Sequence, residues 1–370
     1  MPIILSIVPY KIFPAKVGGQ KGIAFFNEYL AKEIELVCVT VRSNDPKYGK
    51  GYTVLNTLTN SFYRYIDPFY FFYIRKLIKK YNITHLLLEH PYFGWLGILI
   101  KISTGVKLIV HSHNIEATRW KSLHKPWWKI LWWYERLTHR MADFNFFIQD
   151  DDRHYAIEKF GLHASKCITV TYGIEFDRIP PRDEIQKAKQ QLRQLHGIGD
   201  NEFILLFNGA FNYQPNLSAL KKIIEVIDPL LQTRNNFPYK IIICGRDIPD
   251  EITSKSYQNI IFAGFVDDIS TYFKGADIFL NPVNEGGGIK TKLVEALAYN
   301  MNAVSTINGA IGIDPVWCNG KLLLCDDNDW NLFSELVVRA STIKLDILTA
   351  YFEHFYWGYI IKTIASFINK

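Results

Sequence analysis

The sequence predicts an α/β protein built from two doubly wound parallel sheets. Short apolar runs recur along the chain, stretches with apolar residues at three- and four-residue spacing separate them, and one polar segment divides the runs into two sets. The length of 370 residues is enough for two domains, and 48% hydrophobic against 21% charged residues is an ordinary globular composition. We therefore expect no extended disorder.

The first set of apolar runs is expected to form the sheet of an N-terminal domain. The runs are short and show no polar face, as strands do when helices cover both sides of a parallel sheet. In chain order they are IILSIV (3–8), ELVCVTV (35–41), HLLLEH (85–90), KLIVHSH (107–113) and FNFFIQ (144–149).

The second set predicts a second sheet of the same kind. Its strands are FILLFNGA (203–210), YKIIICG (239–245), NIIFAGF (259–265), DIFLNPV (277–283), NAVSTI (302–307) and KLLLC (321–325). Helical spacing is clearest in Asn216–Gln232 and Lys290–Asn300.

A polar segment at about 172–200, with Pro180 and Pro181 near its start, separates the two sets. We place the boundary within it, so that residues 1–175 form the first domain and residues 176–349 the second.

Charge is distributed unevenly between the two halves. Residues 1–175 hold 23 Lys and Arg against 14 Asp and Glu, whereas residues 176–370 hold 19 against 22. The basic first half favours an anionic partner such as a membrane surface or a phosphorylated substrate, with an unremarkable basic domain as the alternative. Nucleic-acid binding is disfavoured because no recognition module is visible and the basic residues are dispersed.

Cysteine usage and the apolar segments indicate a cytoplasmic protein. The five cysteines are widely spaced, and no two form a CxxC pair, so we expect them to be reduced core residues. The N-terminal apolar run is too short for a signal peptide. The most membrane-like segment, 93–110, is interrupted by Lys101 and Lys107, so no membrane span is expected.

Three consecutive glycines, Gly286 to Gly288, lie between an expected strand and an expected helix. A parallel sheet presents helix N-termini to ligands beyond the carboxyl ends of its strands. Such a helix start carries unpaired N–H groups and about half a positive charge, so it binds phosphate readily, and glycine lets phosphate oxygens reach the backbone. The pattern therefore predicts a phosphate site, with a flexible strand–helix turn as the alternative.

The helix after the glycines carries polar side chains at a matching spacing. Thr291, Lys292 and Glu295 lie on one helical face. This places a cation beside the phosphates and a carboxylate where it could hold the vicinal hydroxyls of a ribose.

Several segments carry a family resemblance: VHSHN (110–114), NGAFNYQPN (208–216), ICGRD (243–247), NIIFAGFVDDISTYFKGADIFLNPV (259–283) and GGGIKTKLVEALA (286–298). In this order they resemble the family 4 glycosyltransferases of the GT-B fold. The resemblance implies two Rossmann-like domains that face a cleft, a nucleotide-sugar donor held mainly by the second domain, and retaining hexosyl transfer without a metal or other cofactor. It also implies that residues 350–370 return to the first domain. The implied acceptor is a glycan or a lipid-linked sugar in cell-envelope polysaccharide synthesis.

The resemblance implies donor contacts position by position in the second domain. Glu295 matches the second of two glutamates that many relatives place eight positions apart, near the ribose. The first position holds Gly287, as in the GGG-type branch, which leaves Glu285 or backbone N–H groups as candidates for the sugar contact. The backbone of Phe265 and Val266 is expected to meet the base. The other donor-binding positions implied are Gly209, Gly286, Gly288, Ile289, Lys290, Thr291 and Lys292.

In the first domain, Gly18 and Gly19 match a glycine loop that relatives place beside the diphosphate. His113 matches a histidine that faces the donor sugar, where a neutral imidazole can hydrogen-bond a hydroxyl. His111 shares its face of the strand, so the two could exchange roles.

The catalytic residues implied are therefore His113, Lys292 and Glu295. The resemblance suggests front-face attack, in which the donor phosphate assists deprotonation of the acceptor. Lys292 and the helix start would stabilise the departing diphosphate in place of a metal.

Asp150 to Asp152 formally contain a DxD motif, which binds a metal–nucleotide in the other major glycosyltransferase fold. The same residues suit the N-cap and first turn of a helix that ends at Gly161. We favour the helical interpretation and expect no metal site.

Two segments of the basic half mix aromatic and basic residues, 62–80 and 124–140. Tryptophan together with lysine or arginine suits a membrane interface, and a lipid-linked acceptor would bring the protein to the inner face of the cell membrane. Apolar side chains nearly all around the second segment suit a core helix equally well. Both interpretations stay open.

Two other function classes also stay open. One is a nucleotide-sugar epimerase on the same fold, and the other is a non-catalytic subunit that binds a nucleotide sugar. A dehydrogenase is disfavoured because no GxGxxG opens either sheet.

Overall fold

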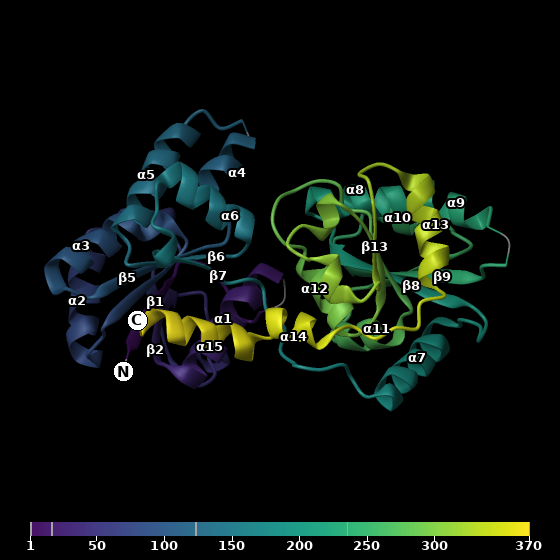
Figure 1. Ribbon diagram of the computed structural model, residues 1–370, viewed down its shortest axis with the longest axis horizontal. Coiled ribbons are helices and arrows are strands. Elements are labelled where there is room, and N and C mark those ends of the chain that lie inside the picture. The colour runs from purple at the N-terminus through teal and green to yellow at the C-terminus, as the bar shows by residue number, and fades with distance from the viewer. Residues whose placement is uncertain (1, 16–17, 123, 235, 370) are drawn as a thin grey trace. The chain divides into compact units, whose positions relative to one another are not determined.

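The chain forms two compact units, each built around a parallel sheet (Figure 1). The computed structural model describes residues 2–15, 18–122, 124–234 and 236–369. Unit 1 comprises Met1–Glu175 and Phe355–Lys370, and unit 2 comprises Phe176–His354. Strands and helices alternate in both units, so the predicted α/β class with two doubly wound parallel sheets is confirmed.

The described part of unit 1 holds a seven-stranded sheet in the order β3-β2-β1-β4-β5-β6-β7, with all neighbouring strands parallel. Its strands are β1 (Ile3–Val8), β2 (Glu35–Val41), β3 (Thr53–Leu58), β4 (His85–Glu89), β5 (Lys107–Ser112), β6 (Phe144–Phe147) and β7 (Cys167–Thr169). Sequence reasoning missed both edge strands. The first of these, β3, is only partly buried and contains polar residues, and β7 is three residues long.

Helices cover both faces of this sheet. On one face, α2 (Phe69–Tyr81) and α3 (Gly94–Thr104) share a core with Leu86 and Leu88. On the other face, α1 (Gly18–Glu33) and α15 (Trp357–Ile368) share a core with Leu87. Successive residues of a strand point to opposite faces, which explains why these strands are continuously apolar. The remaining α-helices described in this unit are α4 (Glu116–Ser122), α5 (Trp128–Met141) and α6 (Asp150–Tyr155).

Unit 2 holds a six-stranded parallel sheet within its described residues, in the order β10-β9-β8-β11-β12-β13. Its strands are β8 (Phe203–Ala210), β9 (Tyr239–Arg246), β10 (Ile260–Gly264), β11 (Ile278–Asn281), β12 (Asn302–Thr306) and β13 (Leu322–Cys325). All six had been expected from the apolar runs, with ends that shift by one or two residues.

The long helix expected at Asn216–Gln232 is present as α8 (Gln214–Lys222), a π-helical segment (Ile223–Ile227) and α9 (Asp228–Gln232) in direct succession. This run and α13 (Trp330–Ala340) share the main core of unit 2 with the sheet. Figure 1 shows α7 (Arg182–His196) and α11 (Ile269–Gly275) on the opposite side of that sheet. The other α-helices described are α10 (Asp250–Thr253), α12 (Thr291–Ala298) and α14 (Thr349–Phe355).

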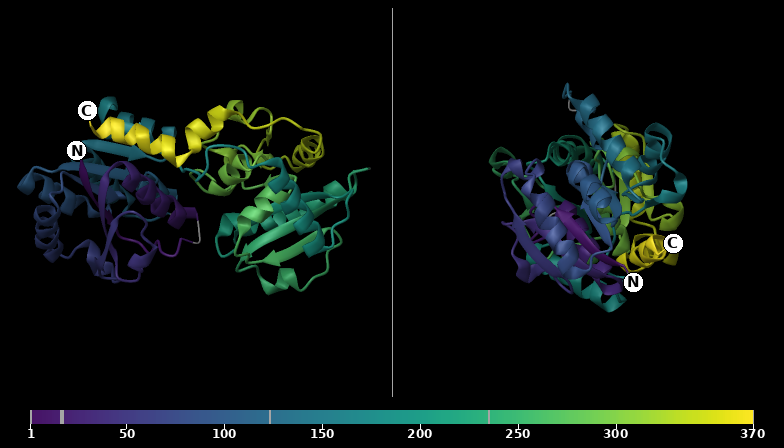
Figure 2. Two further views of the ribbon diagram at one scale, coloured as in Figure 1. Left: turned by 90° about the horizontal axis from the view of Figure 1, so that it is seen from below. Right: turned by 90° about the vertical axis from the view of Figure 1, so that its left-hand side faces the viewer.

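The C-terminal helix α15 belongs to unit 1, where it lies alongside α1 (Figures 1 and 2). The chain returns to unit 1 at Phe355 rather than at residue 350. The preceding residues stay with unit 2, where the Tyr351 hydroxyl donates to the carbonyl oxygen of Val294 (2.8 Å). Trp357, in contrast, is buried in the core of unit 1.

The cysteines and the acidic run at 150–152 have the structures expected from the sequence. Cys38, Cys167, Cys244, Cys318 and Cys325 are all free and buried. Asp150 to Asp152 form the first turn of α6, and the π-helical segment that continues it ends at Gly161, so the helical interpretation is confirmed. Among the described helices, none combines the length and the apolar character needed to cross a bilayer.

Candidate functional site

The three consecutive glycines form the turn between β11 and α12, at the carboxyl end of the unit 2 sheet. Gly286 and Gly288 have φ angles of 83° and 78°, a left-handed conformation that glycine adopts without strain. Gly287 does not share this conformation, and a Cβ atom added there would meet nothing within 4 Å. The backbone conformation of the turn therefore accounts for the glycines at 286 and 288. It does not require glycine at 287, where the absence of a side chain leaves the backbone open to an approaching group.

The two lysines that follow have different partners. The Nζ of Lys290 donates to the carbonyl oxygens of Gly286 (3.1 Å) and Gly288 (2.9 Å), and these bonds stabilise the turn. The Nζ of Lys292 donates to the carbonyl oxygen of Asn208 (3.1 Å) and to Oδ1 of Asn216 (2.8 Å), and lies 4.2 Å from the centre of the Phe207 ring. Burial of the ammonium group, together with the charge of Lys290, lowers the pKa of Lys292 to about 7. An anion beside Lys292 would restore its charged form.

The carboxyl end of β8 contributes Phe207 and Asn208 to the surroundings of Lys292, and the first turn of α8 contributes Asn216. A Cβ atom at Gly209 would lie 2.8 Å from Nδ2 of Asn216, so this position needs glycine. On β9, a Cβ at Gly245 would overlap the carbonyl oxygen of Gly209. The Oδ1 of Asn208 is buried and has no hydrogen-bond partner within the described chain. Buried acceptors without a hydrogen-bond partner are uncommon in protein cores. This oxygen suits a position where a bound ligand donates the missing hydrogen bond.

The other residues predicted to bind the donor are divided between the units. Thr291 and Glu295 are half-buried residues of α12 in unit 2. In the same unit, Phe265 and Val266 follow the carboxyl end of β10, and the Phe265 side chain is exposed. Ile289 precedes α12 and lies close to Gly312, where an added Cβ would approach its side chain to 3.3 Å.

Gly18 and Gly19 begin α1 of unit 1, and His113 directly follows β5 of the same unit. Of the predicted site residues, only Gly18, Gly19 and His113 therefore belong to unit 1, and all the others belong to unit 2.

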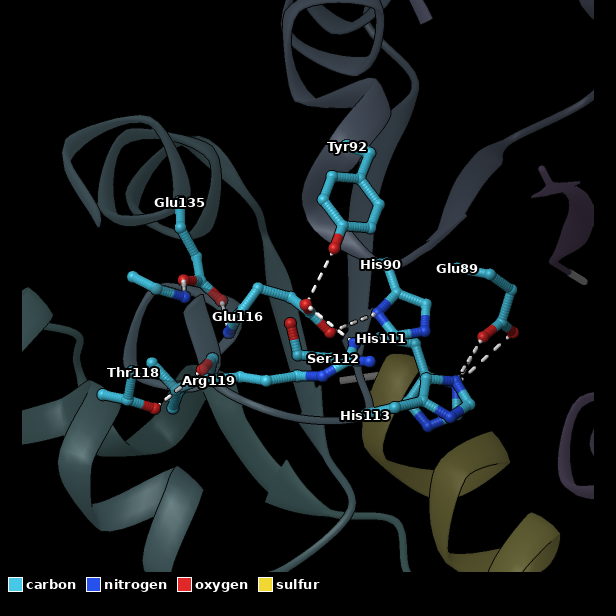
Figure 3. A network of polar contacts seen from close by, with 12 residues as sticks. Glu89, His90, Tyr92, His111, Ser112, His113, Glu116, Thr118, Arg119 and Glu135 are labelled. Atoms are coloured by element: carbon cyan, nitrogen blue, oxygen red, sulfur yellow. Dashed lines mark hydrogen bonds and ion pairs between the residues drawn. The ribbon is translucent and has the colours of Figure 1, made fainter. Parts of the chain in front are cut away.

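In unit 1, a buried carboxylate holds two histidines (Figure 3). Glu89 is the last residue of β4 and pairs in parallel register with His111 of β5. Nδ1 of His111 lies 3.3 and 3.2 Å from the two Glu89 oxygens, and Nε2 of His113 lies 2.8 Å from Oε2. Burial alone would raise the pKa of Glu89, but the two imidazoles outweigh burial and hold it well below its usual range. Glu89 is therefore ionised at any physiological pH.

The residue after Glu89 has an unusual backbone conformation. His90 has φ 68° and ψ 156°, a combination that costs a non-glycine residue about 1–3 kcal/mol. Its ring stacks on that of His113, with centroids 4.5 Å apart and planes at 15°. Burial and the neighbouring His113 lower the pKa of His90 to about 4, so His90 is neutral. Strain of this kind is found at functional sites more often than elsewhere.

Glu116, the first residue of α4, extends the network. It is fully buried, its Oε2 accepts from the Tyr92 hydroxyl (2.7 Å) and from Nη1 of Arg119 (3.3 Å), and its Oε1 lies 3.4 Å from Nδ1 of His90. The carboxylate of Glu135 on α5 accepts from the backbone N–H groups of Glu116 and the following residue, both at 3.0 Å. Helix α5 thus fixes the start of α4 and the position of the Glu116 side chain.

Glu89, His111 and His113 form the one described group whose ligand atoms are close enough for a metal ion, all within 4.8 Å of one another. Hydrogen bonds already account for each nitrogen that faces the carboxylate. A histidine that ligates a metal nearly always donates its second N–H to an acceptor, whereas Nε2 of His111 is buried without a partner in the described chain. The donor set fits a hydrogen-bonded network better than a metal centre.

Comparison with known proteins identifies the family of the chain. Residues 18–178 match the family described as "Glycosyltransferase Family 4", and residues 202–342 match "Glycosyl transferases group 1". Together these matches span both units. The chain belongs to the family 4 glycosyltransferases.

Individual relatives of the glycosyltransferase are distant. Chitobiosyldiphosphodolichol beta-mannosyltransferase of Debaryomyces hansenii is 24% identical over 54% of this chain and 45% of its own length. An uncharacterized 44.6 kDa protein in the cps region of Klebsiella pneumoniae is 25% identical over 72% of this chain and 67% of its own length. The chain thus spans less than half of the first relative and about two thirds of the second.

Solved structures agree in fold. Anabaena HepE, in a crystal structure with UDP and glucose, has a TM-score of 0.71 at 16% identity, with both chains fully covered. The fold is therefore GT-B, as the resemblance implied, while the assignment as a glycosyltransferase enzyme rests on the two family matches.

Sequence reasoning missed several polar residues of these two sites: Glu89, His90, Glu116, Asn208 and Asn216. A signal was present for most of them. Glu89, His90 and Asn208 lie at or next to the carboxyl ends of apolar runs, where parallel sheets place their ligand-binding side chains. Asn216 gives no such signal, because only the folded chain brings it to Lys292.

Proposed function

We propose that the glycosyltransferase moves a sugar from a nucleoside-diphosphate sugar to a glycan or lipid-linked acceptor, with retention of configuration and without a metal. The observation that carries this proposal is the glycine turn of unit 2, in which Gly287 leaves the backbone open just before the helix that carries the incompletely satisfied ammonium of Lys292. A diphosphate supplies the charge and the acceptor oxygens that this arrangement lacks.

Each predicted residue has a role in this proposal. Backbone N–H groups of the turn and the start of α12 receive the diphosphate, and Lys292 stabilises its charge as the sugar leaves. Glu295 holds the ribose, the backbone at Phe265 and Val266 meets the base, and His113 contacts the sugar. Gly209 keeps the end of β8 free of side-chain atoms beside the donor. The other expected donor contacts are Gly18, Gly19, Gly286, Gly288, Ile289, Lys290 and Thr291.

In the proposed step, the acceptor oxygen attacks the anomeric carbon on the face from which the diphosphate departs. The acceptor proton passes to a donor phosphate oxygen, and the bond between the anomeric carbon and the diphosphate breaks, with its electron pair leaving on the phosphate. No protein nucleophile takes part.

Named relatives support the substrate classes. Structures of Anabaena HepE hold UDP with glucose and UDP-glucose. The Debaryomyces relative is named for a diphosphodolichol-linked acceptor, and the Klebsiella relative for its position in a cps region. They support a nucleotide-sugar donor, a lipid-linked or glycan acceptor and a role in bacterial envelope polysaccharide synthesis.

A donor screen tests this proposal. Nucleoside diphosphates are compared by thermal stabilisation, since a ligand at 100 times its Kd adds about 2.7 kcal/mol. The corresponding sugar nucleotides are then supplied with glycan and lipid-diphosphate acceptors, and the anomeric configuration of the product is read by NMR. Transfer with retention is the expected result. Inversion would refute the stereochemistry, turnover without an acceptor would indicate an epimerase, and binding without any turnover would indicate a non-catalytic subunit.

We also propose that unit 1 docks on an anionic membrane. Helix α5 buries Glu135, Thr138 and His139, while Ile130 and Trp133 on the same helix are 74% and 61% exposed. Apolar side chains that point outward do not contribute to the core of unit 1, and an exposed apolar surface of this kind suits an interaction site.

The neighbouring elements continue this surface. Helix α3 packs against both α2 and α5 and exposes Ile102, while the segment 62–72 exposes Phe62, Phe69 and Phe72. Lysines and arginines lie among these residues, as in surfaces that bind anionic lipids.

Sedimentation with liposomes tests the docking surface. Binding should be stronger to vesicles that contain anionic lipid than to neutral ones, and it should weaken as salt rises. Equal binding to both, or none, would contradict membrane docking and leave a soluble acceptor.

A further inference from the structure

We propose that Glu89 is a positioning residue that fixes His113 with Nδ1 as a hydrogen-bond acceptor, so that His113 recognises a hydroxyl group of the sugar substrate. This inference rests on the proposed function and assigns the chemistry of one of its contacts. It is built from the buried network that Figure 3 shows.

The charge of Glu89 determines which histidine nitrogen carries a hydrogen. The Glu89 side chain is completely buried, and its carboxylate is ionised, so it can only accept hydrogen bonds. A nitrogen 2.8 Å from it must carry a hydrogen, and this nitrogen is Nε2 of His113. A neutral imidazole has a single N–H, so in the neutral form of His113 its Nδ1 is a bare lone pair.

Neighbouring rings fix the orientation of the His113 side chain. His90 stacks on one side of His113 at a centroid distance of 4.5 Å, and His111 lies at the same distance with its plane tilted by 38°. Two neighbouring rings and one short hydrogen bond leave His113 little freedom to rotate. The ring therefore keeps Nε2 toward Glu89 rather than exchanging its nitrogens.

His113 and His111 differ in their exposure. His111 also faces Glu89 through Nδ1, but it is only 2% exposed and its Nε2 is enclosed without a partner in the described chain. His113 is half-buried, so it alone of the two can present a nitrogen to a substrate. His111 holds the Glu89 carboxylate in place, whereas His113 makes the contact.

The chemical consequence is a preference for hydrogen-bond donors. A bare Nδ1 accepts from an O–H group and repels the oxygens of phosphate or carbonyl groups, which have no hydrogen to give. A sugar hydroxyl is the group of a nucleotide sugar or a glycan acceptor that fits. Without Glu89, the same ring could adopt the opposite tautomer and offer an N–H instead.

The direct test is the tautomer of His113 in the full-length protein. Two-bond 1H–15N correlation spectra of the ¹⁵N-histidine-labelled chain at pH 8 distinguish the protonated ring nitrogen from the bare one, and the variant His113→Asn assigns the signal. We expect Nε2 of His113 to carry the hydrogen and Nδ1 to be bare. A hydrogen on Nδ1 would overturn the proposal, whatever the activity of the protein.

A variant set then connects the tautomer to turnover. Glu89→Gln keeps the size of the side chain but replaces one acceptor oxygen by an amide donor, so we expect kcat to fall at least tenfold. Affinity for UDP, which contains no sugar hydroxyl beyond its ribose, should stay within twofold. Glu89→Asp keeps a carboxylate and should recover part of the loss. The matched control is Asp228→Asn, which removes the charge of another buried carboxylate, in unit 2, and should leave kcat unchanged.

The outcomes separate this inference from the proposed function. If a folded Glu89→Gln variant keeps kcat within twofold of wild type, the positioning role is wrong even though the enzyme transfers sugar. If wild-type protein transfers no sugar from any donor, the proposed function fails, and a bare Nδ1 on His113 would still establish what Glu89 does. If Glu89→Gln does not fold, the spectrum of the wild-type protein decides whether His113 has the proposed tautomer.

Discussion

The charged form of Lys292 is only partly stabilised by its surroundings. Two uncharged oxygens and an aromatic ring are its partners in the described chain, and its pKa falls to about 7. A lysine in this condition gains most from a ligand that brings negative charge. The donor diphosphate would both bind to Lys292 and set its protonation state.

We therefore expect donor binding to take up a proton above neutral pH. In the free protein at pH 8, most Lys292 side chains are neutral because this pH lies above the pKa of about 7. A bound diphosphate raises that pKa, so the ammonium forms on binding, and affinity should decline as the pH rises from 7 to 9. Calorimetric titration with the nucleoside diphosphate in two buffers of different ionisation enthalpy measures the proton uptake.

Asn216→Asp provides the matched control for this experiment. A carboxylate in place of the Asn216 amide would keep Lys292 charged in the free protein, so the uptake at pH 8 should fall to the share of Lys290, whose pKa burial lowers to about 8. Equal proton uptake in the variant and in wild type would mean that another group titrates.

At the scale of elements, the glycine turn combines a structural and a functional requirement. Positive φ angles at Gly286 and Gly288 are properties of the turn, whereas Gly287 has neither a positive φ nor a close neighbour. The unbound fold therefore has room for a side chain at Gly287.

We predict that Gly287→Ala leaves the unfolding temperature within about 2 °C of wild type but weakens nucleoside-diphosphate binding at least tenfold. The added methyl group would occupy the space through which the phosphate reaches the backbone. Thermal unfolding and calorimetric titration measure the two properties. Gly286→Ala should instead lower the unfolding temperature, because alanine is strained at a φ of 83°. Unchanged affinity in Gly287→Ala would show that no ligand approaches this residue.

The outward apolar face of α5 can be tested in the same way. Trp133→Ser should reduce binding to anionic liposomes at least threefold without a loss of stability, since this side chain is 61% exposed. The control is Leu195→Ser on α7 of unit 2, which removes an equally exposed apolar side chain (62%) away from the proposed surface. Equal losses of liposome binding in both variants would indicate nonspecific hydrophobic binding rather than a docking surface on unit 1.

Much of this organisation could be predicted from the sequence, and the exceptions have physical causes. Continuous apolar runs predicted the strands that helices cover on both faces, but the partly polar edge strand β3 and the very short β7 carry no such pattern. The glycines and Lys292 predicted a phosphate site because these residues lie within a few positions of one another in the sequence. The role of Glu89 depends on the register of β4 against β5, and that of Asn216 on a contact with Lys292 across 76 positions, so neither could be predicted from spacing.

At the scale of the whole molecule, the chain leaves unit 1 after Glu175 and returns to it at Phe355. The returning helix α15 completes the unit 1 core through residues such as Trp357 and Ile361. Unit 1 is therefore assembled from both ends of the described chain.

We predict that Trp357→Ala destabilises unit 1 by about 3–5 kcal/mol, the usual cost of truncating a large buried aromatic residue. The control on the same helix is Tyr359→Ala, which is 42% exposed and should cost well under half as much. Denaturant unfolding measures both. The nucleoside diphosphate should still bind to unit 2 of the Trp357 variant under native conditions, and loss of that binding would contradict the division of roles between the units.

The central claim is that the glycine turn and α12 hold the donor through its diphosphate and ribose. The most direct measurement compares Lys292→Ala and Glu295→Gln with wild type in donor affinity and in transfer rate. Lys292→Ala should lower turnover about 100-fold or more, as the loss of an electrostatic stabiliser of the leaving group does, with a smaller effect on binding. Glu295→Gln should instead weaken binding of the nucleoside diphosphate and of the intact donor alike. If both variants keep donor affinity and transfer rate within about twofold of wild type, a change below about 0.4 kcal/mol, the phosphate-cradle assignment is wrong and the glycines mark only a turn.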